Sequence, residues 1–386
     1  MKALPEPLLT TQRYARLWAE DLRAGAVELD RDPDTIHDLL ELPAVRLLAG
    51  HLAPPDWDRT GPEHGAGPAH GMPTLEKAVI SEELARGDAA TMVGSPGASM
   101  CGVLLGVLGS QAQKDWMYSR LAERPTWTCF ALTEPERGSA IGEMTTTLTP
   151  VGDGSYLLDG EKRYVGNGAR ADLGAVFARV AGTDRLGVTA VLVDTSEPGF
   201  RAEPLPTLGL RGVQLSRITL ERVHVPAERV LGTHLPPTRR GMWSILSVFN
   251  QLRPSVAAIA LGIARAAHEY VGENRKELRG AERELWETLG RRIEAARGLV
   301  YRAAVAVDRR PSDGHLASAA KARACELAEE VTLHAPRFFG PGARLDHPLL
   351  DKLARDARGV EFMEGTRTIQ KLNLFQGLHN GKIGRA

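Results

Sequence analysis

The apolar residues of this 386-residue chain change their spacing twice, and these changes restrict the fold more than any other feature. Between about residues 126 and 235 they form short runs, such as 175–178 and 190–193, which are typical of β-strands. On both sides they recur at steps of three and four, most clearly over residues 285–307, which predicts helices with one buried stripe. Helix, sheet and helix in sequence order predict an α+β fold class with segregated layers. We therefore expect an N-terminal helical domain (1–125), a central β-domain (126–235) and a C-terminal helical bundle (236–386).

Turn residues and apolar spacing predict two details of the β-domain. Residues 156–160 close on Asp159-Gly160, a turn signal, so we expect a strand to end there. Residues 218–225 are apolar at alternate positions with one irregular step, which predicts a strand that contains a bulge.

Residues 53–73 are rich in proline, glycine and histidine, and they are predicted to form a loop. Gly65-Ala66-Gly67 is followed by proline and has no strand before it, so it is not interpreted as a dinucleotide-binding fingerprint. His64 and His70 lie in the same loop without a carboxylate partner, which is more typical of solvated side chains than of a metal site. No metal is expected.

The charge balance and the cysteines bear on the partners and on the cellular location that we expect. Lysine plus arginine equals aspartate plus glutamate at 48 each, which argues against a nucleic-acid partner bound through a strong positive field. The cysteines Cys101, Cys129 and Cys325 are far apart and form no zinc or disulfide pattern, which favours a reducing, cytoplasmic location. The first eleven residues do not resemble a signal peptide, and no run of about 18 apolar residues predicts a membrane span.

Glu364 is the carboxylate that most suggests chemistry. A charged, helix-like run over residues 351–358 is followed by the apolar pair Phe362-Met363, then Glu364, then a Gly-Thr break before a second helical pattern. A carboxylate in apolar surroundings has a raised pKa and can act as a general base near neutral pH. The alternative is an acidic side chain near the start of the second helix that faces water or interacts favourably with the helix dipole.

Two further stretches place Glu364 in a wider pattern. The two further stretches are 129–139 (CFALTEPERGS) and 158–168 (LDGEKRYVGNG). Together with 362–372 around Glu364 (FMEGTRTIQKL) they make three. Their order, spacing and content resemble the acyl-CoA dehydrogenase family of FAD-dependent flavoproteins, over about residues 71–378. The resemblance implies the fold of that family and desaturation of an acyl thioester between its α and β carbons.

In that reaction Glu364 would take the α-proton, its main-chain N–H would help to hold the thioester oxygen, and the β-hydrogen would leave as hydride to flavin N5. Residues 249–254 contain no carboxylate, so Glu364 is the only match to the family's base. The acyl group would be carried by coenzyme A or by an acyl carrier protein. An electron-transfer flavoprotein or similar acceptor would take the electrons from a homotetramer or homodimer, in which two subunits contact each flavin.

The resemblance also assigns binding residues. Those at family positions near the flavin ring are Phe130, Leu132, Thr133, Tyr164 and Gly166. Those at positions near the rest of the cofactor are Arg275, Arg337, Gly340, Thr366 and Thr368. Those expected to bind substrate are Ser139, Asn250 and Arg253.

Several residues depart from the family pattern, and they keep other functions open. The usual aspartate, threonine and phenylalanine are replaced by Ala140, Gly166 and Leu278, and Pro341 removes a backbone donor. Arg253 could instead be a surface arginine in an ion pair. The alternatives for the whole chain are an oxidase or monooxygenase that uses O₂ on the same fold, and a scaffold that has lost its flavin.

Overall fold

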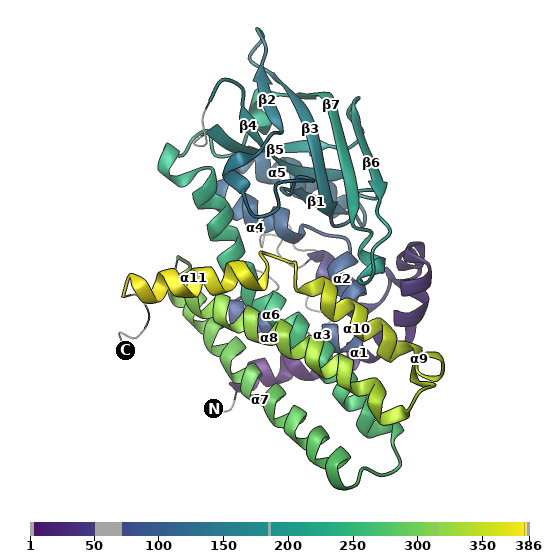
Figure 1. Ribbon diagram of the computed structural model, residues 1–386. Coiled ribbons are helices and arrows are strands. Elements are labelled where there is room, and N and C mark those ends of the chain that lie inside the picture. Colours follow the sequence, from purple (N-terminus) through teal and green to yellow (C-terminus); the bar gives the residue numbers. More distant parts are fainter. Residues whose placement is uncertain (1–3, 51–71, 184–186, 313, 382, 384–386) are drawn as a thin grey trace.

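The computed structural model describes residues 4–50, 72–183, 187–312, 314–381 and 383 (Figure 1). Most of the predicted loop at 53–73, including its Gly-Ala-Gly stretch, His64 and His70, lies outside the described residues. The α+β fold class is confirmed, because a single mixed sheet lies between an N-terminal and a C-terminal set of helices in the sequence.

The N-terminal part is helical as predicted. Its helices are α1 (Glu6–Arg31), the 3-10 helix η1 (Pro33–Leu39), α2 (Pro43–Gly50), α3 (Thr74–Gly94), α4 (Ser99–Leu108) and α5 (Gln111–Glu123). Helix α3 is kinked at Asp88, where φ is −156° and ψ is 117°. The carboxylate of Asp88 accepts hydrogen bonds from the N–H and the hydroxyl of Thr91, at 2.8 and 2.7 Å, and so caps the second half of the helix.

The central part is a seven-stranded sheet in the order β1-β4-β2-β3-β7-β6, with β5 paired to β4. The strands are β1 (Thr128–Ala131), β2 (Thr147–Pro150), β3 (Tyr156–Val165), β4 (Leu173–Val180), β5 (Val188–Asp194), β6 (Phe200–Pro204) and β7 (Ser216–Val225). The pairs β1–β4 and β2–β4 are parallel and the other pairs are antiparallel.

The prediction that a strand ends at Asp159-Gly160 is wrong. Strand β3 continues through both residues, and its register with β7 shifts between Leu158 and Gly160. Gly160 has φ 149°, and the Arg222 N–H donates to the Asp159 carboxylate at 2.8 Å. The glycine therefore belongs to a bulge. The bulge predicted within 218–225 is confirmed, since β7 carries the extra residue at this step.

The C-terminal part is helical again. Its helices are α6 (Met242–Asn274), α7 (Gly280–Arg309), α8 (His315–His334), the 3-10 helix η9 (Ala335–Phe339), α9 (Ala343–Asp346), α10 (Pro348–Val360) and α11 (Arg367–His379). The periodic series at 285–307 forms α7, and its stripe from Leu289 to Val307 is buried. Helix α6 is long and apolar enough to span a membrane, but 61% of that stretch is buried inside the protein, as in the core helix of a globular protein.

The two sets of helices share one hydrophobic core. It includes Leu29 of α1, Ala89 of α3, Ile263 of α6, Val300 of α7 and Leu353 of α10. Parts of the predicted N-terminal and C-terminal helical domains therefore pack together, although they lie at opposite ends of the sequence.

Alternation along β4 connects the sheet to these helices. Phe177 packs in a core with Leu104 of α4 and Ile245 of α6, whereas its neighbour Val176 packs in a second core with Ile218 of β7. The first turns of α6 thus lie against the sheet, and its later turns lie in the helical core. In Figure 1 the connection between α10 and α11 lies where the helices meet the β-domain.

Candidate active site

Glu364 lies in the short connection between α10 and α11. Its backbone is left-handed, with φ 47°, and the next residue, Gly365, has φ 97°. Thr366 then begins α11 as its N-cap, because its hydroxyl accepts a hydrogen bond from the Ile369 N–H at 3.5 Å. A non-glycine residue with positive φ is uncommon, so the surrounding structure must stabilise this conformation.

Lys321, on α8, is one source of that stabilisation. Its ammonium group is fully buried and donates to the carbonyl of Glu361 and, at 2.8 Å, to the carbonyl of Gly365. These carbonyls lie on either side of Glu364 in the sequence, so one side chain fixes both ends of the turn.

Two more side chains hold the turn. Gln370 donates from Nε2 to the carbonyls of Glu364 and Gly365, at 3.0 and 2.9 Å. Arg253, on α6, donates from Nε to the carbonyl of Glu364 at 3.3 Å. Gln370 and Lys321 were not among the predicted site residues. A lysine inside the alanine-rich run 317–325 was the one available signal for Lys321.

The carboxyl group of Glu364 is buried and incompletely satisfied. The residue is 9% exposed, and its Oε2 is buried without a hydrogen-bond partner. Burial raises the pKa of Glu364 to about 7, even though the positive charges of Lys321 and Arg253 oppose the rise. The expected raised pKa is therefore confirmed. The alternative that this carboxylate faces water is wrong.

The apolar neighbours were expected to create this environment, but Phe362 is 56% exposed and the Arg358 guanidinium lies 4.8 Å from its ring centroid. Met363 is partly buried against the helical core. The ring of Phe362 therefore lies at the surface, whereas Arg253 of α6 and Lys321 of α8 contact the turn from buried positions.

Arg253 and Asn250 lie together beside the turn, three residues apart on α6. The Arg253 Nη1 donates to the Asn250 Oδ1 at 2.7 Å, and the Asn250 Nδ2 donates to the carbonyl of Pro311 at 3.4 Å. Arg253 is 3% exposed, and burial lowers its pKa to about 10 although Glu364 favours the charge. The alternative of a surface ion pair is therefore wrong for Arg253.

Aromatic contacts connect the sheet to this group. The ring of Phe130, in β1, lies 5.0 Å from that of Phe177 and 6.4 Å from that of Phe249, measured between centroids. Phe249 is on α6, and its ring centroid is 5.9 Å from the Arg253 guanidinium. A series of contacts thus connects Phe130 through Phe249 and Arg253 to the main-chain carbonyl of Glu364.

The other residues expected near the ring surround the ends of β1 and β3. Leu132 is buried and Thr133 half-buried, and the Thr133 carbonyl accepts from the Arg163 N–H at 2.8 Å. Tyr164 is 55% exposed with φ 60°. At Gly166, an added Cβ would lie 3.3 Å from Val213 Cγ1, so this position leaves little room for a side chain.

Ser139 and Thr368 are exposed. Ser139 is in the loop after β1, and Thr368 is in the first turn of α11. The structure gives neither hydroxyl a role in holding the turn.

Three of the residues expected near the rest of the cofactor lie away from Glu364: Arg275, Arg337 and Gly340. Arg275 ends α6, where it forms an ion pair with Glu282 at 2.9 Å, and its Nε is buried without a partner. Arg337 and Gly340 are exposed around the end of η9, with Gly340 at φ 77°. Arg253 and Arg275 are 22 residues apart on one helix, which corresponds to about 33 Å. One chain therefore does not bring these two groups of residues together.

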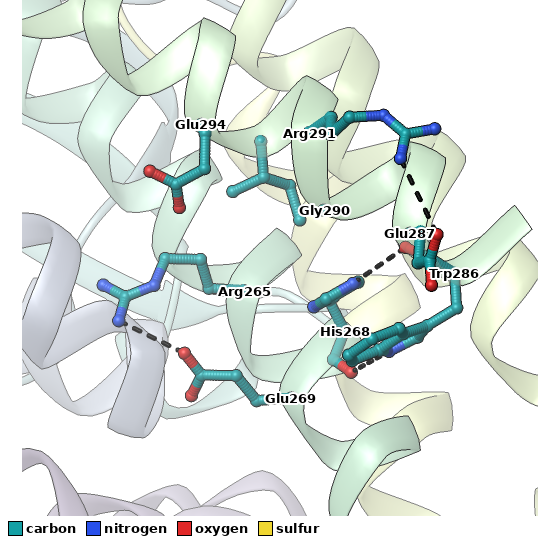
Figure 2. Close-up of a pocket in the computed structure, with 9 residues that line it drawn as sticks. Arg265, His268, Glu269, Trp286, Glu287, Gly290, Arg291 and Glu294 are labelled. Carbon is teal, nitrogen blue, oxygen red and sulfur yellow. Dashed lines mark hydrogen bonds and ion pairs between the residues drawn. The ribbon is translucent and has the colours of Figure 1, made fainter. Parts of the chain in front are cut away.

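A cavity of about 370 Å³ lies between α6 and α7, away from Glu364 (Figure 2). His268 and Trp286 stack in it with ring centroids 4.5 Å apart, and each ring nitrogen pairs with the other residue's carbonyl. Its remaining charged residues include Arg265, paired with Glu269. Within the described parts of the chain, no group of three or more histidine, cysteine or acidic side chains could hold a metal.

Comparison with known proteins shows to which family the sequence and the fold are similar. The family pattern described as acyl-CoA dehydrogenase, middle domain, matches residues 129–223, and that described as acyl-CoA dehydrogenase, C-terminal domain, matches 239–379. The chain is 33% identical to cyclohexane-1-carbonyl-CoA dehydrogenase of Geobacter metallireducens over 68% of this chain and 71% of that protein. It is 34% identical to an acyl-CoA dehydrogenase of Bacillus subtilis over 71% of this chain and 74% of that protein.

Among solved structures, the butyryl-CoA dehydrogenase of Megasphaera elsdenii superposes with a TM-score of 0.83 at 26% identity. The superposition covers 98% of this chain and 100% of the other. The middle-domain match contains Phe130, Thr133 and Tyr164, and the C-terminal match contains Arg253 and Glu364.

Proposed function

Since the chain belongs to the acyl-CoA dehydrogenase family, we propose that Glu364 is the base that removes the α-proton of its acyl thioester substrate. The protein is an FAD-dependent oxidoreductase that acts on CH–CH groups. The observation that carries the assignment of Glu364 is its buried carboxyl group, which has an unpartnered oxygen and a pKa raised to about 7. A base with a pKa near the operating pH transfers protons efficiently.

The residues present fit an FAD. Tyr164 offers an exposed aromatic ring, and Phe130 and Thr133 offer apolar surface and a hydroxyl at the boundary between sheet and α6. At the far end of α6, the unpartnered Arg275 Nε is a donor suited to phosphate or an adenine edge. We propose that these residues hold the cofactor, whose chemistry when bound is to accept the hydride that leaves the β-carbon.

The protein's own part in the reaction then follows from the turn. Glu364 takes the α-proton at its unpartnered Oε2 and becomes a neutral carboxylic acid. Its main-chain N–H would hold the thioester oxygen, where negative charge develops as the proton leaves. Because several side chains fix the carbonyls of this turn, the N–H and the carboxyl group keep a constant relative position.

The substitution Glu364→Gln tests the proposed role. Glutamine keeps the size of the side chain but cannot accept the α-proton, so the variant should fold, keep its FAD and bind substrate. Flavin reduction should slow by at least about 10²-fold, which corresponds to about 2.7 kcal/mol of barrier. The measurement is anaerobic stopped-flow bleaching of the oxidised flavin, with Glu326→Gln as a control because that carboxylate is exposed on α8. Bleaching of Glu364→Gln at the wild-type rate would contradict the assignment.

We further propose acyl-CoA as the thioester and an electron-transfer flavoprotein as the acceptor. Relatives named for CoA thioesters support the first part, and a similar solved structure whose title names an electron transferring flavoprotein of Acidaminococcus fermentans supports the second. Oxygen uptake during turnover, compared with reduction of the acceptor flavoprotein under argon, separates this proposal from an oxidase. Comparison of acyl-CoA with the same acyl group on a carrier protein tests the carrier.

We also propose a homotetramer or homodimer in the cytoplasm. The distance between the Arg253 and Arg275 ends of α6 supports an assembly, since a second chain could supply the far cofactor contacts. The three free cysteines, Cys101, Cys129 and Cys325, are all buried, which fits a reducing compartment. Sedimentation with and without FAD would test the assembly.

A further inference from the structure

We propose that Lys321 is a positioning residue for this reaction, which fixes the turn around Glu364 and supplies a buried positive charge that acts on its carboxylate. The proposal rests on the proposed role of Glu364 as the base. It assigns a task to a residue on α8, an element that contributes none of the predicted site residues.

The surroundings of Lys321 set it apart from the other fully buried lysines of the described chain, Lys162 and Lys352. Lys162 is paired with Glu134 at 3.1 Å, and Lys352 is paired with both Asp88 and Asp356. Lys321 forms no ion pair with any described residue, and its hydrogen bonds go to two main-chain carbonyls. A buried charge without a partner is costly, so its retention indicates a use for the charge.

The hydrogen bonds of Lys321 define the first part of that use. They end on the carbonyls of Glu361 and Gly365, which bracket the left-handed residue Glu364. Release of either carbonyl would allow the turn to relax. Both the main-chain N–H and the carboxyl group of Glu364 would then lose their common orientation.

The positive charge defines the second part. The cations that act on the Glu364 carboxyl are Lys321 from α8 and Arg253 from α6, and both lower its pKa against the effect of burial. Glu361 lies in the same turn, where its carboxylate accepts from the Arg367 N–H at 2.8 Å. Cys325, one turn along α8, has its pKa raised to about 12 by burial and so carries no charge near neutral pH.

Gln370 allows the effect of the hydrogen bonds of Lys321 to be separated from the effect of its charge. It donates to the carbonyls of Glu364 and Gly365, at 3.0 and 2.9 Å, so it also holds the turn, but it carries no charge. Loss of Gln370 should disturb the position of the base without a direct effect on its ionisation. Loss of Lys321 should change both.

The experiment measures the rate of flavin reduction against pH for four variants, all loaded with FAD and followed anaerobically. In Lys321→Met, loss of the cation should raise the apparent pKa of the rate profile by about 1. With a starting value of about 7, the rate at pH 7 should fall about fivefold from ionisation alone and recover at alkaline pH. Lys321→Gln should show the same rise in the midpoint, and Lys321→Arg, which keeps the charge, should not.

Gln370→Leu is the matched control. Its rate should fall at every pH with the midpoint unchanged. The inference is overturned if Lys321→Met or Lys321→Gln keeps the wild-type midpoint, or if Lys321→Arg moves it as far as they do. If one substitution prevents folding, the other neutral variant gives the same comparison. Failure of the underlying function is distinguished by Glu364→Gln, which would then reduce its flavin at the wild-type rate.

Discussion

Two buried glutamates of this protein have opposite properties. Glu134, after β1, is 3% exposed and accepts from the N–H and hydroxyl groups of Thr145 and Thr146 at 2.6–2.8 Å, and from Lys162 at 3.1 Å. Burial alone would raise its pKa, but Lys162 and these hydrogen bonds lower the pKa to about 2. Glu364, in the α10–α11 turn, has an unpartnered oxygen and a pKa raised to about 7.

Burial of a carboxyl group can therefore serve either structure or chemistry. The partners of Glu134 satisfy both of its carboxylate oxygens. The charged side chain therefore fixes the loop after β1 to the next strands. Its neighbour in the sequence, Thr133, is half-buried. The partners of the turn at Glu364 bind its main-chain carbonyl and leave the carboxyl group free to change its protonation state. The polypeptide is fixed in both regions, but only in the second is the acid itself available.

Removal of the structural carboxylate should have the largest effect on stability. In Glu134→Gln, the buried Lys162 loses its counter-ion, so the free energy of unfolding should fall by about 3–5 kcal/mol. Chemical denaturation at neutral pH measures this loss. The exposed neighbour Glu136 gives a control, since Glu136→Gln should change stability by less than about 0.5 kcal/mol. An equal effect of both substitutions would contradict the structural role of Glu134.

Stability against pH should separate the two glutamates. The lowered pKa of Glu134 means that its contribution is present above about pH 4.5 and is lost as pH falls toward 2. The raised pKa of Glu364 has the opposite sign, because the folded state holds that proton more tightly than the unfolded chain does. The free energy of unfolding should therefore fall as pH rises from about 4.5, where a glutamate in the unfolded chain ionises, to about 7, where Glu364 ionises in the folded state.

In Glu364→Gln this pH-dependent loss should disappear. Relative to wild type, the variant should gain about 3 kcal/mol in its free energy of unfolding between about pH 4.5 and pH 8. Parallel denaturation series at the two pH values measure the gain, and Glu326→Gln again serves as the exposed control. A constant difference between wild type and Glu364→Gln across this range would show that the Glu364 carboxyl titrates as it does in water.

Much of the fold could be predicted from the sequence because the spacing of apolar residues indicates which segments form helices and which form strands. The buried stripe of α7 repeats every three or four residues, and β4 is a short, continuous apolar run whose first six residues are all buried. Glu364 could also be found, since a charged helix, an apolar pair and a Gly-Thr break coincide at one residue. These signals depend only on neighbours in the sequence.

The features that could not be predicted depend on contacts between distant residues. The bulge at Gly160 replaces an expected turn because β7, some 60 residues later, carries the extra residue opposite it. Lys321 precedes the turn that it holds by about 40 residues, and a lysine in a helix is more typical of an exposed side chain. A surface position was an alternative for Arg253, but in the structure it is buried and donates to the carbonyl of Glu364.

The smallest expected effect concerns Phe362, which separates the sequence pattern from the physical cause of the raised pKa. Its ring is exposed and contacts the Arg358 guanidinium, so Phe362→Ala should change the free energy of unfolding by only about 0.5–1 kcal/mol. The midpoint of the rate profile for flavin reduction should stay at its wild-type pH, because this ring is exposed and contacts Arg358, whereas buried side chains of α6 and α8 hold the turn. The same anaerobic pH series measures this midpoint, with Arg358→Ala as the partner substitution that removes the cation and keeps the ring. If Phe362→Ala lowers the midpoint toward the pKa of a free glutamate while Arg358→Ala does not, the apolar ring itself desolvates the base. The contrast with Glu134 would then depend on a surface side chain instead of on the buried turn.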